Sequence, residues 1–313
     1  MTIHEFKQMT AHVYWLSPDG TTDRPVLGVV TGANGSLVVD AGNSPAHARV
    51  LLDHMAAAGL PAPRFLALTH WHWDHWFGAA AFDAPAIAHA ATRRILVEQA
   101  AWNWSDAALD ARVAAGVEIA FCCDMLKAEL PDRRDLVLRA PDVAFTGELT
   151  IDLGGVTCRL LHVGGDHAAD SVIVHVPEEG IVFLGDCRYD DIYHAPPRLT
   201  AATIRSLYDR LLALDAAWYL GGHEPEPIAR AALVAESELV RCISAAIDHL
   251  GAQREAVLAA LRGQAGSPLD EDSVAIADAL LAGAQAVPID TETSRAREGD
   301  RAAERGSSVR TAG

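Results

Sequence analysis

The sequence predicts a mixed α/β fold, in which strand-rich segments are separated by helices. Short apolar runs bounded by Gly, Asn and Pro occur before residue 90 and again after residue 149, the pattern typical of buried strands. Between and after them lie stretches whose apolar residues recur at helical spacing. The chain has 313 residues, half of them hydrophobic, so it can form one large domain or two small ones with a substantial core.

The first elements are predicted from turn and cap signals. In residues 24–42, RPVLGVVTGANGSLVVDAG, two apolar runs flank a turn-forming GANG and predict a hairpin. A helix is predicted over residues 44–59, because Ser44 followed by Pro is a helix start signal and the segment ends in Gly. RFLALT (64–69) and APAIAHA (84–90) are short apolar runs that predict buried strands.

The remaining elements follow from changes in periodicity. Residues 91–140 are rich in Ala and Leu at helical spacing and predict two or three helices. Strands are predicted within 149–163, 171–186 and 216–223, with a helix over 200–215.

This order of elements divides the chain into a main domain and a helical extension. The main domain is predicted over residues 1–227, with a helical insertion at about 91–140, and the C-terminal helical extension over 228–288. Residues 289–313 have almost no large apolar side chains and predict a disordered tail.

Composition excludes several classes of protein. The net charge is −17, and we see no run of Lys or Arg that could hold a phosphate backbone, so nucleic acid is not an expected partner. No stretch approaches 18 apolar residues and no secretory signal is visible, so we expect no membrane span and a cytoplasmic protein. The five cysteines are scattered and do not resemble a disulfide framework. A small-molecule substrate is the expected partner, and a homodimer remains open.

The segment THWHWDH, residues 69–75, crowds ligand-type side chains together directly after a predicted strand. Most of the fourteen histidines need no functional explanation, but His70, His72, Asp74 and His75 fall within six positions. Alternate side chains of an extended segment point the same way, so His70 and His72 can aim at one point. Two metal ions could share this corner. A catalytic zinc ion usually takes three protein ligands, so further ligands must come from elsewhere in the chain.

HWHWDH resembles the HxHxDH signature of the metallo-β-lactamase superfamily, and further motifs of that family follow in its order. LHVGGDHAADSVIV (161–174) matches the stretch that carries the next histidine, with His167 as the ligand and His162 in a structural position. VFLGD supplies Asp186, and WYLGGH supplies His223. SLVVDAG matches an early strand of the family and puts Asp40 in its buried structural place. The resemblance covers about residues 12–225.

The resemblance implies a four-layer αββα sandwich and two zinc ions per chain. It implies that His70, His72 and His167 bind the first metal, that Asp74, His75 and His223 bind the second, and that Asp186 bridges both. Cys187 is an alternative ligand at the bridging position, because some lactamase-type members use a cysteine in this neighbourhood. The chain departs from the family in having Trp76 and Phe77 where a small, flexible pair is usual.

The implied chemistry is hydrolysis by a hydroxide shared between the metals, with Asp74 accepting or passing a proton. Tyr189 follows Asp186 by three residues, as in the acyl-homoserine lactonase branch, where a Tyr hydrogen-bonds the lactone; Arg188 stands near the position of a lactamase-type Lys. If residues 91–140 form a lid over the metals rather than a dimer surface, Trp102 and Trp104 would line an apolar pocket. An ester, lactone, thioester or amide of a fairly apolar small molecule is then the expected substrate.

Other functions are compatible with the same set of candidate ligands. Relatives with similar metals act as polyketide cyclases or thioesterases, and others hold non-haem iron and act as oxidoreductases on persulfides. A nuclease is disfavoured by the negative charge, and a non-catalytic binding module by the complete ligand set.

Overall fold

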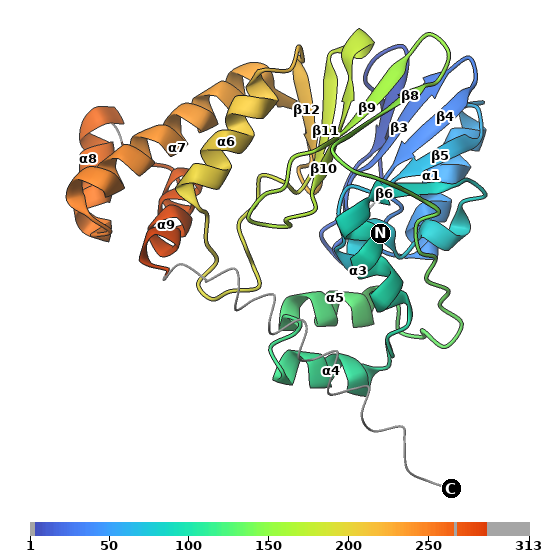
Figure 1. Ribbon diagram of the computed structural model, residues 1–313, viewed down its shortest axis with the longest axis horizontal. Helices are drawn as coiled ribbons and strands as arrows, with labels where there is room; N and C mark the ends of the chain where they lie inside the picture. The colour runs from blue at the N-terminus through green and yellow to red at the C-terminus, as the bar shows by residue number, and fades with distance from the viewer. Residues whose placement is uncertain (1–3, 266–267, 287–313) are drawn as a thin grey trace, which may run out of the picture.

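A computed structural model describes residues 4–265 and 268–286 of the chain. Two β-sheets pack face to face at the centre, and helices cover the outer face of each (Figure 1). The predicted disordered tail, residues 289–313, lies outside the described residues. No helix in the described part of the chain is long and apolar enough to cross a membrane.

The first sheet has seven strands in the order of the sequence. The strands are β1 (Phe6–Gln8), β2 (Val13–Leu16), β3 (Leu27–Gly32), β4 (Gly35–Val39), β5 (Pro63–Ala67), β6 (Ala86–His89) and β7 (Val143–Phe145). The predicted hairpin is confirmed, because β3 and β4 pair antiparallel across the turn. From β4 to β7 the strands run parallel, so their carboxyl ends lie at one edge of the sheet.

The second sheet has six strands in the order β13-β12-β11-β10-β9-β8. Their bounds are β8 (Glu148–Asp152), β9 (Thr157–His162), β10 (Val172–Val176), β11 (Ile181–Gly185), β12 (Trp218–Gly221) and β13 (Ile228–Ala229). Strands β11 and β12 pair parallel and the rest pair antiparallel. The three segments predicted to carry strands after residue 149 are confirmed.

The helices form the two outer layers. On the first sheet lie α1 (Pro45–Ala57) and α3 (Ala90–Ala100), and on the second lie α6 (Ala201–Leu212) and α7 (Arg230–Leu250), with α8 (Arg254–Ala265) and α9 (Glu271–Gln285) beyond α7 (Figure 1). The short helices α2 (Trp73–Trp76), η1 (Ala79–Ala81) and η2 (Pro177–Glu179) lie in loops. The predicted insertion forms α3, α4 (Asp106–Ala114) and α5 (Ala120–Glu129), with α4 and α5 below the sheets.

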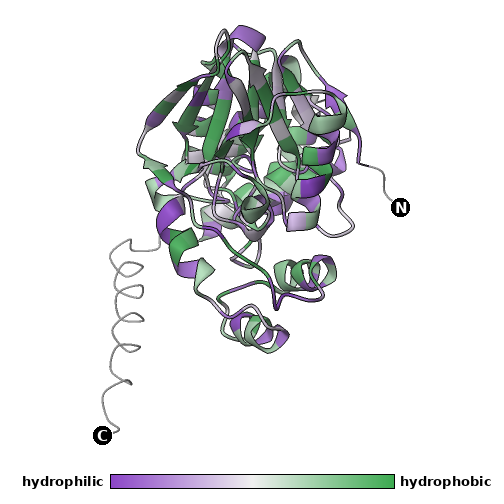
Figure 2. Cartoon of the chain, turned by 90° about the vertical axis from the view of Figure 1, so that its right-hand side faces the viewer, coloured by the Kyte–Doolittle hydropathy of each residue, from purple (hydrophilic) through white to green (hydrophobic). Residues whose placement is uncertain are grey.

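Alternation along the strands explains why both faces of each sheet are covered. In β4, Leu37 and Val39 point into the core between the sheets, while Val38 points to the helical layer outside. In β11, Phe183 points inward, and Val182 and Leu184 point outward. A strand buried on both faces is apolar at every position, which is why the strands in Figure 2 are largely hydrophobic. The sheets approach closely at Gly28, where a Cβ atom would overlap the ring of Phe183.

The fold therefore has the αββα order that the resemblance implied. Ser44 caps α1 through a hydrogen bond from the His47 amide, which confirms the predicted start of that helix. The edge strand β1 and its neighbour β2 were not predicted.

Candidate metal centre

The candidate site lies where parallel strands of both sheets end. His70 follows β5, Asp186 follows β11 and His223 follows β12, each within three residues of its strand. Carboxyl ends of parallel strands meet at one edge, and ligands bind there in open α/β sheets. A hydrogen bond from the Val172 amide to the Thr69 carbonyl joins the two sheets beside the site.

The seven side chains predicted as ligands lie in two adjacent groups. His70, His72 and His167 form one group, and Asp74, His75, Asp186 and His223 form the other. Within each group the ligand atoms lie within 4.8 Å of one another. All are buried except His223, whose side chain is 26% exposed.

Asp186 occupies the position between the two groups. Its Oδ2 lies 3.2 Å from Nε2 of His75 and 3.4 Å from Nε2 of His223. The same oxygen lies 3.6 Å from Nε2 of His167 and 3.8 Å from Nε2 of His70. A Cβ atom on Gly222 would collide with Asp186 Oδ1, so the glycine of the GGH motif leaves room for this carboxylate.

Further contacts fix the orientation of the histidine rings. Nδ1 of His75 lies 2.8 Å from Asp40 Oδ2, and the same carboxylate accepts hydrogen bonds from the Thr69 amide and hydroxyl. Nδ1 of His70 lies 3.0 Å from Thr69 Oγ1, and Nδ1 of His167 lies 3.1 Å from the Asp190 carbonyl. Such contacts at Nδ1 turn Nε2 toward the site, as is usual for metal-binding histidines.

The chemistry of the donor set fits divalent metal ions. Four buried atoms that point into the site have no hydrogen-bond partner among the described residues: Nε2 of His70, His72 and His167, and Oδ1 of Asp186. Burial holds the pKa of His70 and of His72 well below the usual range, so both rings are neutral and offer a lone pair. Buried polar atoms without partners are rare in native proteins, and coordination to metal ions would satisfy all four.

Asp23 belongs to the site but carries no sequence signal. Its Oδ1 lies 3.6 Å from Nδ1 of His223, on the side away from Asp186. Its backbone φ is +60°, unusual for a residue other than glycine. Burial raises the pKa of Asp23 to about 7, and the neighbouring Asp74 adds to this effect. A positive φ at an Asp cannot be read from the sequence, so the residue was missed.

Two neighbours of the ligands lie outside the groups. His162 stacks on His89 with ring centroids 3.9 Å apart, and its Nε2 lies 3.0 Å from the Ala169 carbonyl. The Cys187 side chain is buried against α6 and α7 residues in the second helical layer, and burial raises the pKa of its thiol to about 12. In this geometry Asp186, and not Cys187, faces the histidines.

Tyr189 lines the same cavity, but its hydroxyl is engaged with protein. The Tyr189 hydroxyl donates to Glu224 Oε2 at 2.7 Å and accepts from the His223 amide at 3.3 Å. Arg188 pairs with Glu224 and Glu236, so its charge is neutralised by two carboxylates. Neither side chain is free to act on a substrate without leaving these partners.

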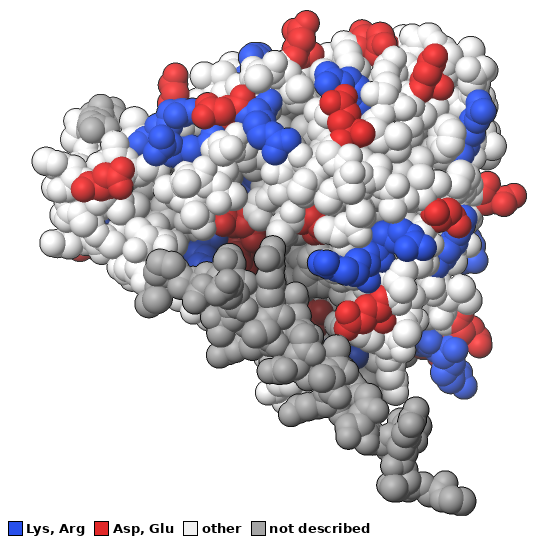
Figure 3. Space-filling model, viewed as in Figure 1, with Lys and Arg blue, Asp and Glu red and all other residues white. Residues whose placement is uncertain are grey.

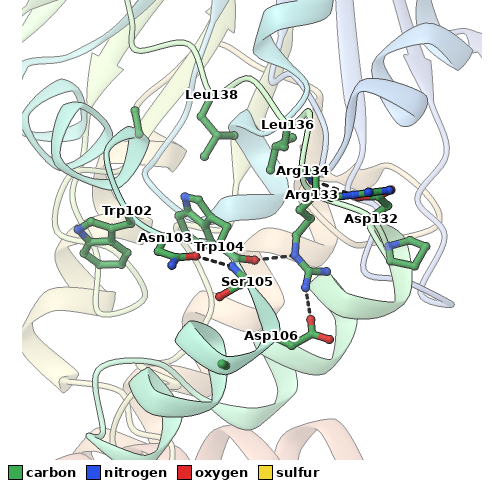
Figure 4. Close-up of a pocket in the computed structure, with 13 residues that line it drawn as sticks. Trp102, Asn103, Trp104, Ser105, Asp106, Asp132, Arg133, Arg134, Leu136 and Leu138 are labelled. Carbon is green, nitrogen blue, oxygen red and sulfur yellow. Dashed lines mark hydrogen bonds and ion pairs between the residues drawn. The ribbon is translucent and has the colours of Figure 1, made fainter.

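The helical insertion borders the cavity beside the candidate ligands, but not through the segment that carries Trp102 and Trp104. Phe121 and Cys122 of α5 line the cavity with the candidate ligands. The expectation that Trp102 and Trp104 would line it is wrong. Both line a separate cavity of about 890 Å³ between α4 and residues 131–138 (Figure 4). Trp104 is held there because its ring packs on Phe77, at 4.9 Å between centroids.

The tryptophans between the ligands serve mainly to pack the loop. Trp73 and Trp76 are buried in the core of the first helical layer. Trp71 is partly buried and packs against His72 and Tyr193.

Comparisons with known proteins agree with this architecture. The family model described as the metallo-β-lactamase superfamily matches residues 23–223. The acyl-coenzyme A thioesterase MBLAC2 of Gallus gallus is 28% identical over 198 residues, which cover 59% of this chain and 65% of that protein. The type 2 metallo-β-lactamase of Bacteroides fragilis is 39% identical over 54 residues, 17% of this chain and 21% of that protein. The chain thus spans less than two thirds of the length of either relative.

Solved structures share the fold. A metallo-β-lactamase from Pontibacter korlensis superposes with a TM-score of 0.53 at 19% identity, covering 76% of this chain and 99% of that one. The sec-alkylsulfatase Pisa1 from Pseudomonas sp. superposes with a TM-score of 0.58 at 12% identity, covering 82% of this chain and 45% of that one. The family match spans more than half of the chain and includes all seven side chains of the two groups. This protein belongs to the metallo-β-lactamase superfamily.

Proposed function

We propose that this protein is a hydrolase that holds two zinc ions and cleaves an ester, lactone, thioester or amide bond of a fairly apolar small molecule. The observation that carries the proposal is the convergence of seven ligand-type side chains, four of whose buried atoms have no other partner among the described residues. His70, His72 and His167 would hold one ion, Asp74, His75 and His223 the other, and Asp186 would bridge them. Membership of a family that includes metal-dependent hydrolases supports this reading.

The metals would supply the nucleophile, because divalent ions lower the pKa of water from 15.7 to about 7. We assign the proton transfer between the attacking water and the leaving group to Asp74. Its Oδ2 lies 3.0 Å from Nε2 of His75 and 3.2 Å from Nε2 of His223. From this position the Asp74 carboxylate would accept a proton from the attacking water and pass it to the leaving group.

Tyr189 is the donor that we propose for the carbonyl oxygen of the substrate. Burial, reinforced by Asp186 and Glu224, raises the pKa of Tyr189 well above its usual range, so the phenol keeps its proton. That proton is now donated to Glu224. Stabilising an oxyanion requires the hydroxyl to rotate away from Glu224 and toward the cavity that Tyr189 and Glu224 both line.

The proposal is tested by activity together with bound metal. Protein purified without chelator is assayed on a panel of neutral esters, lactones, thioesters, amides and β-lactams. After dialysis against a chelator it is assayed again, with and without added zinc. We expect hydrolysis of at least one acyl substrate, loss of that activity on chelation and its return with zinc. Activity that survives complete removal of metal, or no activity across the panel in zinc-loaded protein, contradicts the proposal.

A further inference from the structure

The candidate metal centre opens into a groove that extends well beyond the ligands. The cavity has a volume of about 980 Å³, and its walls include Asp74, His167 and Asp186 at one end. Its other end lies between α7 and α9, in the C-terminal helical part that follows the family match at residue 223. The groove is larger than the ligands alone require, so its far part can accept a substantial portion of a substrate.

Helices α7 and α9 face the groove with the same spacing. Residues 232, 235, 236 and 239 of α7 and residues 272, 275, 276 and 279 of α9 line it, each set at positions i, i+3, i+4 and i+7. This spacing places each set on one face of its helix. Four of the eight are alanine, namely Ala232, Ala235, Ala275 and Ala279. Leu239 and Ile276 are larger apolar side chains, and the remaining two, at positions 236 and 272, are acidic. The small side chains leave space open, and six of the eight side chains on these two helix faces are apolar.

The charges around the groove are strongly unbalanced. Eight carboxylate side chains line it, namely Asp23, Asp74, Asp186, Asp190, Glu224, Glu236, Asp270 and Asp272. Arg188 is the one Lys or Arg among the described lining residues, and it is paired with Glu224 and Glu236. Acidic side chains are visible in the central hollow of the molecule in Figure 3. Even with two divalent ions bound, the formal charge of this lining stays negative.

The acidic groups lie at both ends of the groove. Asp23 and Asp190 lie beside the candidate ligands, while Asp270 and Asp272 lie at the start of α9. A substrate carrying several negative charges would meet carboxylates whichever way it was oriented, and like charges brought together disfavour binding.

We infer that the substrate is an uncharged or cationic acyl compound whose extended apolar chain lies between α7 and α9. This inference rests on the proposed function and narrows it. The polyphosphorylated leaving group of a coenzyme A thioester is disfavoured by the acidic lining, although a relative bears the name of an acyl-coenzyme A thioesterase. Burial of the acyl chain against alanine, leucine and isoleucine side chains makes substrate binding depend on the length of that acyl chain.

The charge selectivity is tested with two thioesters of one acyl chain. Decanoyl-N-acetylcysteamine has a neutral leaving group, and decanoyl-coenzyme A has a polyanionic one. We expect kcat/KM for the neutral thioester to exceed that for the coenzyme A ester by about tenfold or more at low salt, with a smaller ratio at high salt because ions screen exposed charges. An equal or higher kcat/KM for the coenzyme A ester overturns the inference.

The apolar chain site is tested by a length series and by filling the groove. Each added CH₂ contributes up to about 0.8 kcal/mol when buried, which is about fourfold in kcat/KM. We expect kcat/KM to rise from butanoyl to decanoyl thioesters. Ala235→Phe and Ala275→Phe should lower the decanoyl-to-butanoyl ratio by about tenfold, mainly through KM. Ala231→Phe is the matched control, since Ala231 is exposed on α7 and does not line the groove. A decanoyl-to-butanoyl kcat/KM ratio that is the same in all three variants contradicts an acyl-chain site between α7 and α9.

A binding measurement separates this inference from the proposed function. N-phenyl-1-naphthylamine is a neutral apolar dye whose fluorescence rises in apolar sites. We expect saturable binding to zinc-loaded protein, competition by decanol, and loss of binding in Ala235→Phe but not in Ala231→Phe. Dye binding without hydrolysis of any substrate in the ester, lactone, thioester, amide and β-lactam panel rejects the proposed function and supports an apolar binding groove. Hydrolysis with no dye binding and no preference for acyl-chain length rejects the acyl-chain site between α7 and α9 and leaves the proposed function standing.

Discussion

Nδ1 of His75 lies 2.8 Å from Oδ2 of Asp40, and both side chains are buried. Asp40 follows strand β4, whereas His75 lies in α2, so this contact fixes the loop of candidate ligands to the sheet. Asp40 also accepts two hydrogen bonds from Thr69, which contacts Nδ1 of His70 through its hydroxyl. One carboxylate thus orients a histidine in each group.

Asp40→Ala is expected to weaken zinc binding by about 10–100-fold, because it removes the partner that orients His75 and, through Thr69, His70. Zinc affinity is measured by competition with a fluorescent chelator. Asp53→Ala, on the exposed face of α1, is the matched control and should bind zinc as the wild type does. Unchanged zinc affinity in Asp40→Ala would show that the contact is not needed to orient the rings.

Asp186→Ala is expected to cost more than about 100-fold in kcat/KM, since loss of a direct ligand should exceed the cost of an outer contact. Oδ2 of Asp186 is near Nε2 of four histidines, and no other described carboxylate has that position. Cys187→Ala should retain kcat/KM within about threefold and lose only about 1 kcal/mol of stability. A larger loss of activity in Cys187→Ala than in Asp186→Ala would reverse the choice of bridging residue.

Tyr189→Phe is expected to lower kcat on the best ester or lactone by about 10–10³-fold, because an oxyanion donor acts mainly in the transition state. Zinc content should not change, as Tyr189 lies outside both ligand groups. Glu224→Gln serves as a comparison, since it keeps a partner for the phenol without the charge. Unchanged kcat in Tyr189→Phe would mean that the hydroxyl only anchors Glu224 and the His223 amide.

The buried side chain of Asp170 predicts how the stability of the folded protein depends on pH. Its side chain is buried, and burial raises its pKa to about 6, an effect that nearby Thr92 partly opposes. In the unfolded chain the pKa of an Asp is about 3.9. Between these values the folded state holds the proton and the unfolded state does not, so stability falls as pH rises from about 4 to about 6.

Asp170→Asn should remove this contribution and be more stable than the wild type at pH 7 by up to about 3 kcal/mol, at 1.36 kcal/mol per pKa unit. The difference between the two proteins should shrink toward pH 4. Urea unfolding at several pH values measures it, and subtraction of the two curves removes the titration of other groups. A difference that does not depend on pH would show that Asp170 has an ordinary pKa.

The sequence was sufficient for the parts of the site that follow strands. His70, Asp186 and His223 come directly after apolar runs, so local patterns place them at the same edge of the fold. Strands buried on both faces, such as β10 and β11, were also predicted because they are apolar throughout. The edge strand β1 was not, because its three residues, Phe6–Gln8, carry no alternation that could be recognised.

The parts that depend on contacts distant in sequence could not be predicted. Trp104 lies in the insertion, as expected, but its packing on Phe77 directs it away from the candidate ligands. The partner of Tyr189 is Glu224, 35 residues away. The groove is formed by faces of α7 and α9 that local periodicity identifies only as helical surfaces.

The metal content of four proteins purified without chelator tests the central claim most directly. By mass spectrometry of bound elements, we predict about two zinc ions per chain in the wild type and in His162→Ala, because His162 contacts the Ala169 carbonyl and His89 rather than the ligand groups. We predict clearly fewer in His167→Ala and in Asp186→Ala, which each remove a side chain of those groups. Only trace metal in the wild type, or equal zinc content in all four proteins, would contradict the assignment of a binuclear zinc centre to these residues.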